Sequence, residues 1–444
     1  MRIAGIQFPK WTPYALIGAV AVLVVALCTG GRKRAGETED APFRETPFNE
    51  YITNDMSSFD GMKRLDRDIA AFMSYWHLRG VSLAVMRHDS LLFVRGYGHT
   101  DTLRRNGQRD SLLPMGPETI LRLASVSKLV TAIGVMKLKE EGKLKLSDKV
   151  FDPETGILRG RSYCERITDK RYYDITVEHL LRHEGGFSQR LGDPMFSTLV
   201  VMKRNGLTEA PDAPTLMWTQ LENRLKAAPG TVKEYSNFGY FVLSLVIEAA
   251  SGSSYEQYMQ EHVLRPAGCA GFRIAGNSYA EKQFNETRYY PSDKDTLYFE
   301  ASGSGRKVDR CYASDIRLLQ GAGAWVASPA ELARLVASVD GDPRVPDILS
   351  KESIREMTRH HEHRYSLGWN ETDPEIGWMR SGYFSGTHAL IKYFPDGECW
   401  ILVTNTGTWK GPGFAKKVSA KFSDWRRSWS SKLPKQDLFL VSPK

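Results

Sequence analysis

The chain has 444 residues, of which 41% are hydrophobic, so it can bury one large core without needing several independent domains. Its net charge of +8 is concentrated at the ends: residues 1–34 hold five basic and no acidic side chains, and residues 410–444 hold nine basic and two acidic ones. The remainder carries a charge of about −4, which argues against a basic cleft for nucleic acid. We therefore expect no nucleic-acid partner.

The N-terminal segment contains an uncharged, mostly apolar run of 18 residues, Tyr14 to Gly31. That length fits a short membrane-spanning helix and also a long signal-peptide core. Three outcomes are open: a retained signal anchor, a cleaved signal peptide, or lipidation at Cys28, which is disfavoured because Leu27 stands where a small residue is wanted. We favour a single anchor within residues 1–34 that contacts the cell membrane. Residues 35–55, rich in Glu, Thr and Pro, would then form a flexible tether to a body in the periplasm or outside the cell.

The first elements of the body are a helix and a hairpin. The pattern predicts a helix over residues 60–77, followed by two apolar runs on either side of a short turn at His88 and Asp89. Such a pair of runs is typical of a β-hairpin.

A second helix is predicted from Ser125, because Leu129, Ile133 and Met136 repeat at helical spacing. Ser125 and Lys128 form an S-x-x-K sequence. A serine in the first turn of a helix and a lysine three residues later lie on the same face, so the amine can reach the hydroxyl that it must activate. Ser125 is therefore the candidate nucleophile.

Residues 151–320 are predicted to be mostly helical and loop segments. Within them, Tyr235 and Asn237 form a Y-x-N sequence about a hundred residues after the S-x-x-K sequence. Further along the chain, we predict strands near 365–369, 386–394 and 399–405, a helix over about 412–430 and a basic tail at 431–444.

This order predicts an α+β fold, in which an antiparallel sheet is assembled from N- and C-terminal segments and is flanked by helices. A mainly helical lobe, about 151–320, would be inserted into a body that spans 56–430. The cleft would then lie where the lobe joins the sheet.

The chain resembles the β-lactamase-related family, which includes class C β-lactamases, D-alanyl-D-alanine carboxypeptidases and esterases. The resemblance covers about residues 60–425 and includes, besides the S-x-x-K motif, four ordered blocks at 142–150, 175–187, 228–240 and 321–334, of which 228–240 contains the Y-x-N motif. It implies a β-lactamase/transpeptidase-like fold and a serine hydrolase that cleaves an amide or ester carbonyl of a small molecule or peptide through a Ser125 acyl-enzyme. Catalysis would fall to Ser125, Lys128 and Tyr235, without a cofactor or metal.

The third motif departs from the family. Where the family has Lys or His, then Thr or Ser, then Gly, this chain has Arg380, Ser381 and Gly382. An arginine stays protonated and offers a bidentate fork instead of a point charge. The resemblance assigns substrate binding to these three residues and Asn237, and assigns the oxyanion hole to the backbone amides of Ser125 and Tyr383.

The general base is open at this point. Lys128 would serve if desolvation and the charge of Arg380 depress its pKa, and Tyr235 would serve as a phenolate if Lys128 stays charged beside it. A catalytically silent binding or sensor protein with a penicillin-binding fold is the alternative function, on two grounds: a bulky arginine at position 380 would block the cleft, or the alignment of the third motif is shifted.

Histidines and cysteines carry little functional signal. His179 and His183 stand four residues apart, which is metal-ligand spacing, but no third ligand accompanies them, so we expect structural roles. Once Cys28 is set aside, four cysteines remain, and their sequence pattern leaves both disulfides and free thiols open.

Overall fold

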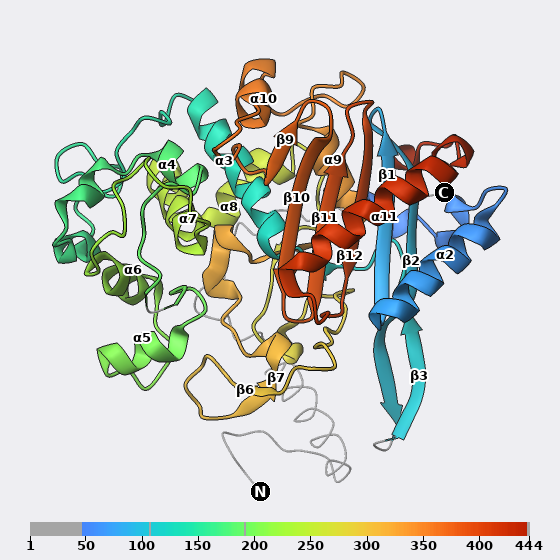
Figure 1. Cartoon of the computed structure of the whole chain (residues 1–444), viewed down its shortest axis with the longest axis horizontal. Helices are drawn as coiled ribbons and strands as arrows, with labels where there is room; N and C mark the ends of the chain where they lie inside the picture. The colour runs from blue at the N-terminus through green and yellow to red at the C-terminus, as the bar shows by residue number, and fades with distance from the viewer. Residues whose placement is uncertain (1–46, 106–107, 191, 442–444) are drawn as a thin grey trace, which may run out of the picture. The chain divides into compact units, whose positions relative to one another are not determined.

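The structure, a computed structural model, describes residues 47–105, 108–190 and 192–441. Its main element is a seven-stranded antiparallel sheet with the strand order β3-β2-β1-β12-β11-β10-β9 (Figure 1). The strands are β1 Gly80–Arg87, β2 Ser90–Arg105, β3 Gln108–Pro114, β9 Glu371–Asp373, β10 Gly377–Phe384, β11 Thr387–Tyr393 and β12 Glu398–Thr404. An N-terminal strand and a C-terminal strand pair at the centre of this sheet, where Val81 of β1 lies opposite Thr404 of β12. The α+β prediction is confirmed.

Two helices from opposite ends of the described chain cover one face of the sheet. They are α2 Met62–Trp76 and α11 Phe414–Trp429, which lie next to each other in Figure 1. Apolar residues at helical spacing in α2, such as Ile69 and Phe72, share a core with Trp400 of β12 and Phe422 of α11. Both helices agree with the sequence-based expectation.

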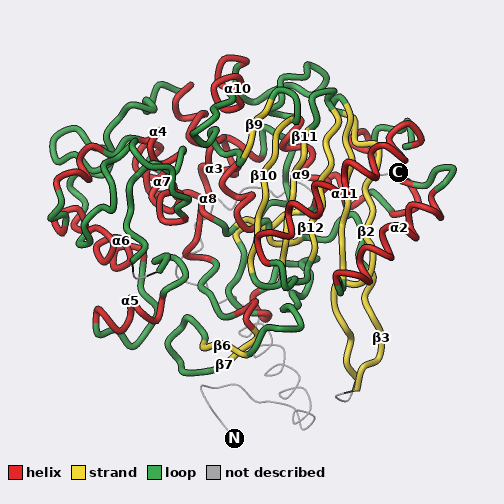
Figure 2. Tube along the Cα trace, viewed as in Figure 1, coloured by secondary structure: helices red, strands yellow, loops and turns green. Residues whose placement is uncertain are grey.

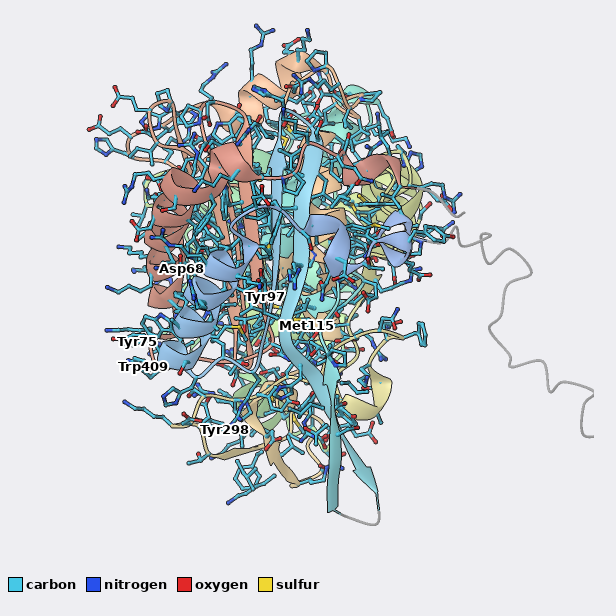
Figure 3. The ribbon with its side chains drawn as sticks, turned by 90° about the vertical axis from the view of Figure 1, so that its right-hand side faces the viewer. Asp68, Tyr75, Tyr97, Met115, Tyr298 and Trp409 are labelled. Carbon is cyan, nitrogen blue, oxygen red and sulfur yellow. The ribbon has the colours of Figure 1, made fainter. Side chains whose placement is uncertain are left out.

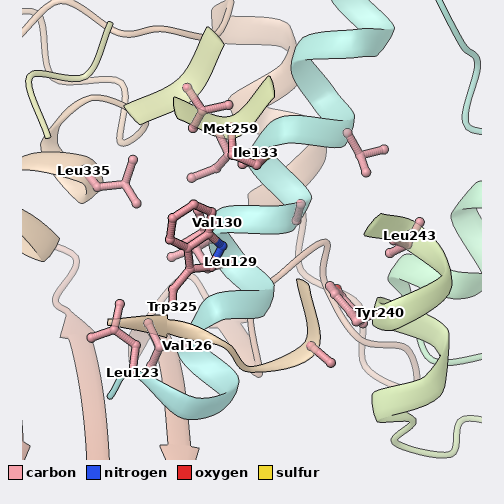
Figure 4. Packing of buried hydrophobic residues seen from close by; sticks show 14 of the residues in the cluster. Leu123, Val126, Leu129, Val130, Ile133, Tyr240, Leu243, Met259, Trp325 and Leu335 are labelled. Carbon is pink, nitrogen blue, oxygen red and sulfur yellow. The ribbon is translucent and has the colours of Figure 1, made fainter. Parts of the chain in front are cut away.

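The other face is covered by α3 Ser127–Glu140 and α9 Pro329–Ala337. Helix α3 is buried on nearly all sides, which is the pattern of a helix in the interior of a large domain. Figure 4 shows Leu129, Val130 and Ile133 of α3 surrounded by side chains from other elements, among them Trp325. The helix that carries the lysine of the S-x-x-K sequence is thus held rigidly by the core.

The segment 151–320 forms mostly helices and loops beside this core (Figure 2). Its helices are α4 Val177–Leu181, α5 Thr198–Asn205, α6 Ala213–Leu221, α7 Asn237–Ser251 and α8 Tyr255–Met259. The segment also contains a two-stranded ribbon, β6 Leu297–Phe299 and β7 Lys307–Asp309. Strand β5 Arg273–Ile274 joins β4 Leu121–Arg122 and β8 Trp325–Ala327 in a small sheet, and α10 Lys351–Thr358 follows α9.

The predicted strand at 365–369 is wrong, because these residues form an irregular segment with a bend at Leu367 and Gly368 before β9. Gly368 has a left-handed φ of +82°, and a Cβ on it would lie 2.7 Å from the Cβ of Ala132 in α3. A strand cannot continue through such a backbone conformation, and the segment instead packs closely on α3. By contrast, the predicted strands 386–394 and 399–405 correspond to β11 and β12, with the turn at 395–397 between them.

The segments that we expected to be a tether and a tail have ordered parts. In the predicted tether, the chain forms the 3-10 turn η1 Phe48–Tyr51, and a second turn, η2 Asn54–Ser57, begins at its end. Ile52 between them is buried. In the segment 431–444, Leu438 is buried, and the Asp437 carboxylate accepts a hydrogen bond from the Leu91 amide.

The predicted anchor, residues 1–34, lies outside the described residues. Within the part of the chain that the structure describes, no helix is both long and apolar enough to cross a membrane. The cysteines of that part, Cys164, Cys269, Cys311 and Cys399, are free thiols.

Candidate active site

Ser125 lies in a 3-10 turn, η3 Ala124–Val126, that leads directly into α3. Ala124 has a φ of 47°, a left-handed conformation that is strained for a residue with a Cβ. Strand β10 passes close to this turn, since a Cβ on Gly382 would lie 2.2 Å from the Leu123 carbonyl oxygen and 3.0 Å from the Ser125 nitrogen. Only glycine allows the strand and the turn to approach this closely.

Lys128 is fully buried, and its Nζ lies at the centre of a polar cluster. It donates to Ser125 Oγ at 3.2 Å, to Asn237 Oδ1 at 2.7 Å and to the Ala322 carbonyl at 2.6 Å. These three acceptors come from α3's entry turn, α7 and the loop before β8. They fix the amine beside the serine hydroxyl.

Tyr235 completes this cluster from the entry of α7. Its hydroxyl is within hydrogen-bonding reach of both Ser125 and Lys128, and its ring centroid lies 4.9 Å from Lys128 Nζ. The helix begins immediately after it because the Ser236 hydroxyl accepts a hydrogen bond from the Gly239 amide, a typical N-cap. The structure therefore brings Ser125, Lys128 and Tyr235 together.

The environment lowers the pKa of both candidate bases. Burial lowers the pKa of Lys128, and the charge of Arg380 lowers it further, against the opposing effect of Tyr235. For Tyr235, burial alone would raise the pKa, but the positive charges of Lys128 and Arg380 outweigh it, so its pKa is lowered. The two groups act on each other and are best treated as a pair that shares a proton.

Arg380 occupies a different place from the substrate-contacting one that we predicted. It is fully buried in β10, and its Nε and Nη2 donate to the Ser125 carbonyl oxygen at 2.8 and 2.6 Å. Its fork thus holds the backbone of the nucleophile, and the residue is not among those that line the cavity. From this position its fixed charge acts on Lys128 and Tyr235 without contacting the cavity.

After Arg380, the edge of β10 that faces away from β11 is no longer paired with β9. The Ser381 amide donates to Asn370 Oδ1 at 2.7 Å, so it points away from β11. Because successive amides of a strand alternate in direction, the Tyr383 amide points to the same edge. Tyr383 and Ser125 both line one cavity, where strand β10 passes the nucleophile turn at Gly382. Two backbone amides that reach the same cavity are what an oxyanion hole requires.

That cavity has a volume of about 590 Å³ and is open to solvent. Polar groups of Ser125, Tyr235, Asn237 and Ser381 line it together with an aromatic wall, which consists of Phe196, Tyr298, Tyr383 and Phe384. A substrate of drug or short-peptide size would fit.

Two residues at the site were not assigned a part in it by the sequence. Asp193 Oδ2 accepts from Asn237 Nδ2 at 2.6 Å, which turns the Asn237 oxygen toward Lys128. His183 stacks on Tyr235 with ring centroids 4.4 Å apart and accepts the Ser236 amide at its Nδ1. Burial, followed by the charges of Lys128 and Arg380, holds the pKa of His183 well below its usual value, so it packs as a neutral ring.

We find no metal-binding geometry in the described residues, where no three or more His, Cys, Asp or Glu side chains are placed to hold an ion. His179 has a local role instead. It closes a capping box with Thr176 at the start of α4, in which each residue's backbone amide donates to the other's side chain.

Comparison with known proteins agrees with this geometry. A protein-family model described as Beta-lactamase matches residues 65–416. Protein flp of Staphylococcus aureus (strain MW2) is 26% identical over 349 residues, which are 78% of this chain and 63% of that protein. The chain thus spans less than two thirds of the length of that relative. Putative penicillin-binding protein PbpX of Bacillus subtilis (strain 168) is 24% identical over 401 residues, 87% of this chain and 88% of that protein.

Solved structures share the fold at lower identity. D-amino acid amidase from Ochrobactrum anthropi SV3, complexed with D-phenylalanine, has a TM-score of 0.62 and 18% identity and covers 83% of this chain and 99% of its own. The octameric penicillin-binding protein homologue from Pyrococcus abyssi has a TM-score of 0.60 and 22% identity, with 85% and 79% of the two chains covered.

Proposed function

Because the chain belongs to the beta-lactamase family, we propose that it is a serine hydrolase that cleaves an amide or ester carbonyl through an acyl-enzyme on Ser125. The observation that carries this proposal is the placement of a buried amine, Lys128 Nζ, 3.2 Å from Ser125 Oγ, with the Tyr235 hydroxyl in reach of both. A serine hydroxyl is a poor nucleophile at neutral pH unless such a base stands beside it.

In the proposed reaction, Ser125 Oγ attacks the substrate carbonyl while its proton passes to the Lys128–Tyr235 pair. The negative charge that develops on the carbonyl oxygen is stabilised by the amides of Ser125 and Tyr383. Collapse of the tetrahedral intermediate breaks the bond to the amine or alcohol, which leaves with the proton. Water, deprotonated by the same pair, then attacks the acyl-enzyme. The bond between Ser125 Oγ and the acyl carbon breaks, the pair returns the proton to Ser125 Oγ, and the acid is released.

The alternative of a silent binding protein rested in part on an arginine that blocks the cleft. Arg380 is fully buried and turned toward the Ser125 carbonyl, so this objection does not apply to the described site. The lowered pKa values of Lys128 and Tyr235 also favour proton transfer, since groups that titrate nearer to neutral pH are the more effective bases.

We also propose that the protein is exported and held at the membrane by its N-terminal segment. This rests on the sequence alone, on the apolar run from Tyr14 to Gly31. Full-length protein should then sediment with membranes and be released by protease added outside the cell or to spheroplasts. A full-length protein found in the soluble cytoplasmic fraction would contradict the proposal.

The activity is tested by incubating the purified protein with p-nitrophenyl esters and D-amino-acid amides. We expect turnover that disappears in Ser125→Ala and persists in Ser314→Ala, which removes another hydroxyl from the same cavity. Turnover that is unchanged in Ser125→Ala, or no turnover of any member of the panel together with no labelling by a fluorescent penicillin, would contradict the proposed enzyme.

A further inference from the structure

A single charged side chain, Arg310, lies among the described residues that line the catalytic cavity. It begins the 3-10 turn η8 Arg310–Tyr312, directly after the β6–β7 ribbon. The other two cations near the nucleophile, Lys128 and Arg380, are fully buried and are held by protein oxygens. A substrate in the cavity therefore meets positive charge at Arg310.

The guanidinium of Arg310 is held in place from two sides. Its Nη1 donates to Asp295 Oδ1 at 2.6 Å, and its Cζ lies 4.6 Å from the centroid of the Tyr298 ring. Tyr298 also lines the cavity, and Figure 3 labels it on the ribbon. A guanidinium that is oriented in this way loses little side-chain entropy when a ligand binds.

Asp295 engages only one nitrogen of this guanidinium, and other donors engage its second carboxylate oxygen. The Ser292 amide donates to Asp295 Oδ2 at 3.0 Å, and the Ser385 hydroxyl does so at 3.4 Å. Arg310 and Ser292 lower the pKa of Asp295 against the effect of burial, so Asp295 stays ionised and orients the guanidinium. The Arg310 side chain keeps 42% of its surface exposed.

Resting on the proposed function, we propose that Arg310 is the residue that recognises a carboxylate on the substrate, a role that Arg380 is turned too far inward to fill. The preferred substrates are then esters or amides that carry an anionic group in either the acyl or the leaving part. The free edge of the guanidinium would form two parallel hydrogen bonds to that carboxylate. Its neighbours Tyr298 and Tyr383 would pack against the apolar part of the same substrate.

The test uses two substrate pairs that differ only by a methyl group on a carboxylate. One pair is mono-p-nitrophenyl glutarate and its methyl ester, with the charge in the acyl part. The other is the hippuryl thioester of thioglycolic acid and its methyl ester, with the charge in the leaving part. We expect the wild type to prefer the free carboxylate by about tenfold or more in kcat/KM in at least one pair, chiefly through KM.

Arg310→Ala should abolish that preference and leave kcat/KM for the methyl esters within about twofold of wild type. Arg310→Lys, which keeps the charge but loses the fork, should retain part of it. Arg306→Ala is the matched control, because Arg306 lies in the loop that joins β6 to β7, pairs with Glu300 and does not line the cavity. It should preserve the full preference.

Equal turnover of both members of each pair by the wild type, or a preference that survives in Arg310→Ala, would overturn this inference while the Ser125 hydrolase stands. If neither pair is hydrolysed and no probe labels Ser125, the proposed function fails and the inference fails with it.

Discussion

At the scale of single residues, the site depends on a buried amine that is kept close to a serine hydroxyl by fixed acceptors. We predict that Lys128→Ala lowers the rate of acylation at least about a thousandfold, because general-base help of this kind contributes up to about 10⁴-fold. Lys137→Ala is the control: Lys137 lies on the same helix, but its Nζ donates to the distant Ile348 carbonyl. The rate of acylation of each variant is measured by stopped-flow spectroscopy with a chromogenic ester. An unchanged rate in Lys128→Ala would remove the amine from the mechanism.

Arg380 is predicted to set the pH range of activity although it touches no substrate. Its charge lowers the pKa of both Lys128 and Tyr235, so its removal raises both. The pair then holds its proton to higher pH, and the acidic limb of the pH–rate profile in Arg380→Gln should move upward by about one unit. Arg380→Lys keeps the charge and should leave the limb near its wild-type position. If the acidic limbs of the pH–rate profiles of wild type and Arg380→Gln coincide, Arg380 does not have this role.

At the scale of elements, the contact between β10 and the nucleophile turn places the oxyanion donors. Gly382→Ala would put a methyl group within 2.2 Å of the Leu123 carbonyl and force the strand away from the turn. We expect loss of acylation and a decrease of about 1–3 kcal/mol in the free energy of unfolding. Gly413→Ala should change neither, because nothing lies within 4 Å of its added methyl group and its φ is an ordinary −67°. Normal acylation in Gly382→Ala would show that the close approach is dispensable.

A second prediction at this scale concerns the contact between the β1–β2 turn and the loop after α9. Asp89 in the turn and Asp340 in the loop act on each other electrostatically, and burial raises the pKa of Asp89 to about 6 and that of Asp340 to about 8. A carboxyl whose pKa is raised by folding contributes stability at low pH that is lost as the pH rises through its folded-state value. The free energy of unfolding should therefore fall as the pH rises from about 4 to about 8.

Asp340→Asn should flatten that dependence, since only one carboxyl then ionises. Urea unfolding at several pH values measures it, with the exposed Asp424→Asn as the control that retains the wild-type slope. A steeper or unchanged slope in Asp340→Asn would contradict the raised pKa values of this pair.

At the scale of the whole molecule, the sequence predicted the pairing of distant segments better than it predicted side-chain directions. Local spacing at a helix start placed Lys128 beside Ser125, and the resemblance to the family added Tyr235 through the Y-x-N sequence. The direction of Arg380 was not predictable, since it depends on the Ser125 carbonyl, a backbone group that leaves no mark in the sequence.

Two other features were missed for related reasons. Asp193 contributes through one long-range hydrogen bond to Asn237 and belongs to no motif. The segment at 365–369 looks like a strand because its apolar pattern serves packing on α3, where the left-handed Gly368 breaks the extended conformation. Tertiary contacts, not local preference, decided both.

The central claim is that Ser125 becomes acylated, and the intact mass of the protein after reaction with a fluorophosphonate or a penicillin tests it most directly. We predict the addition of one adduct per chain, located by peptide mass spectrometry on Ser125 and lost in Ser125→Ala. An unmodified mass under conditions that label a known serine hydrolase, or an adduct on a different residue, would contradict the account.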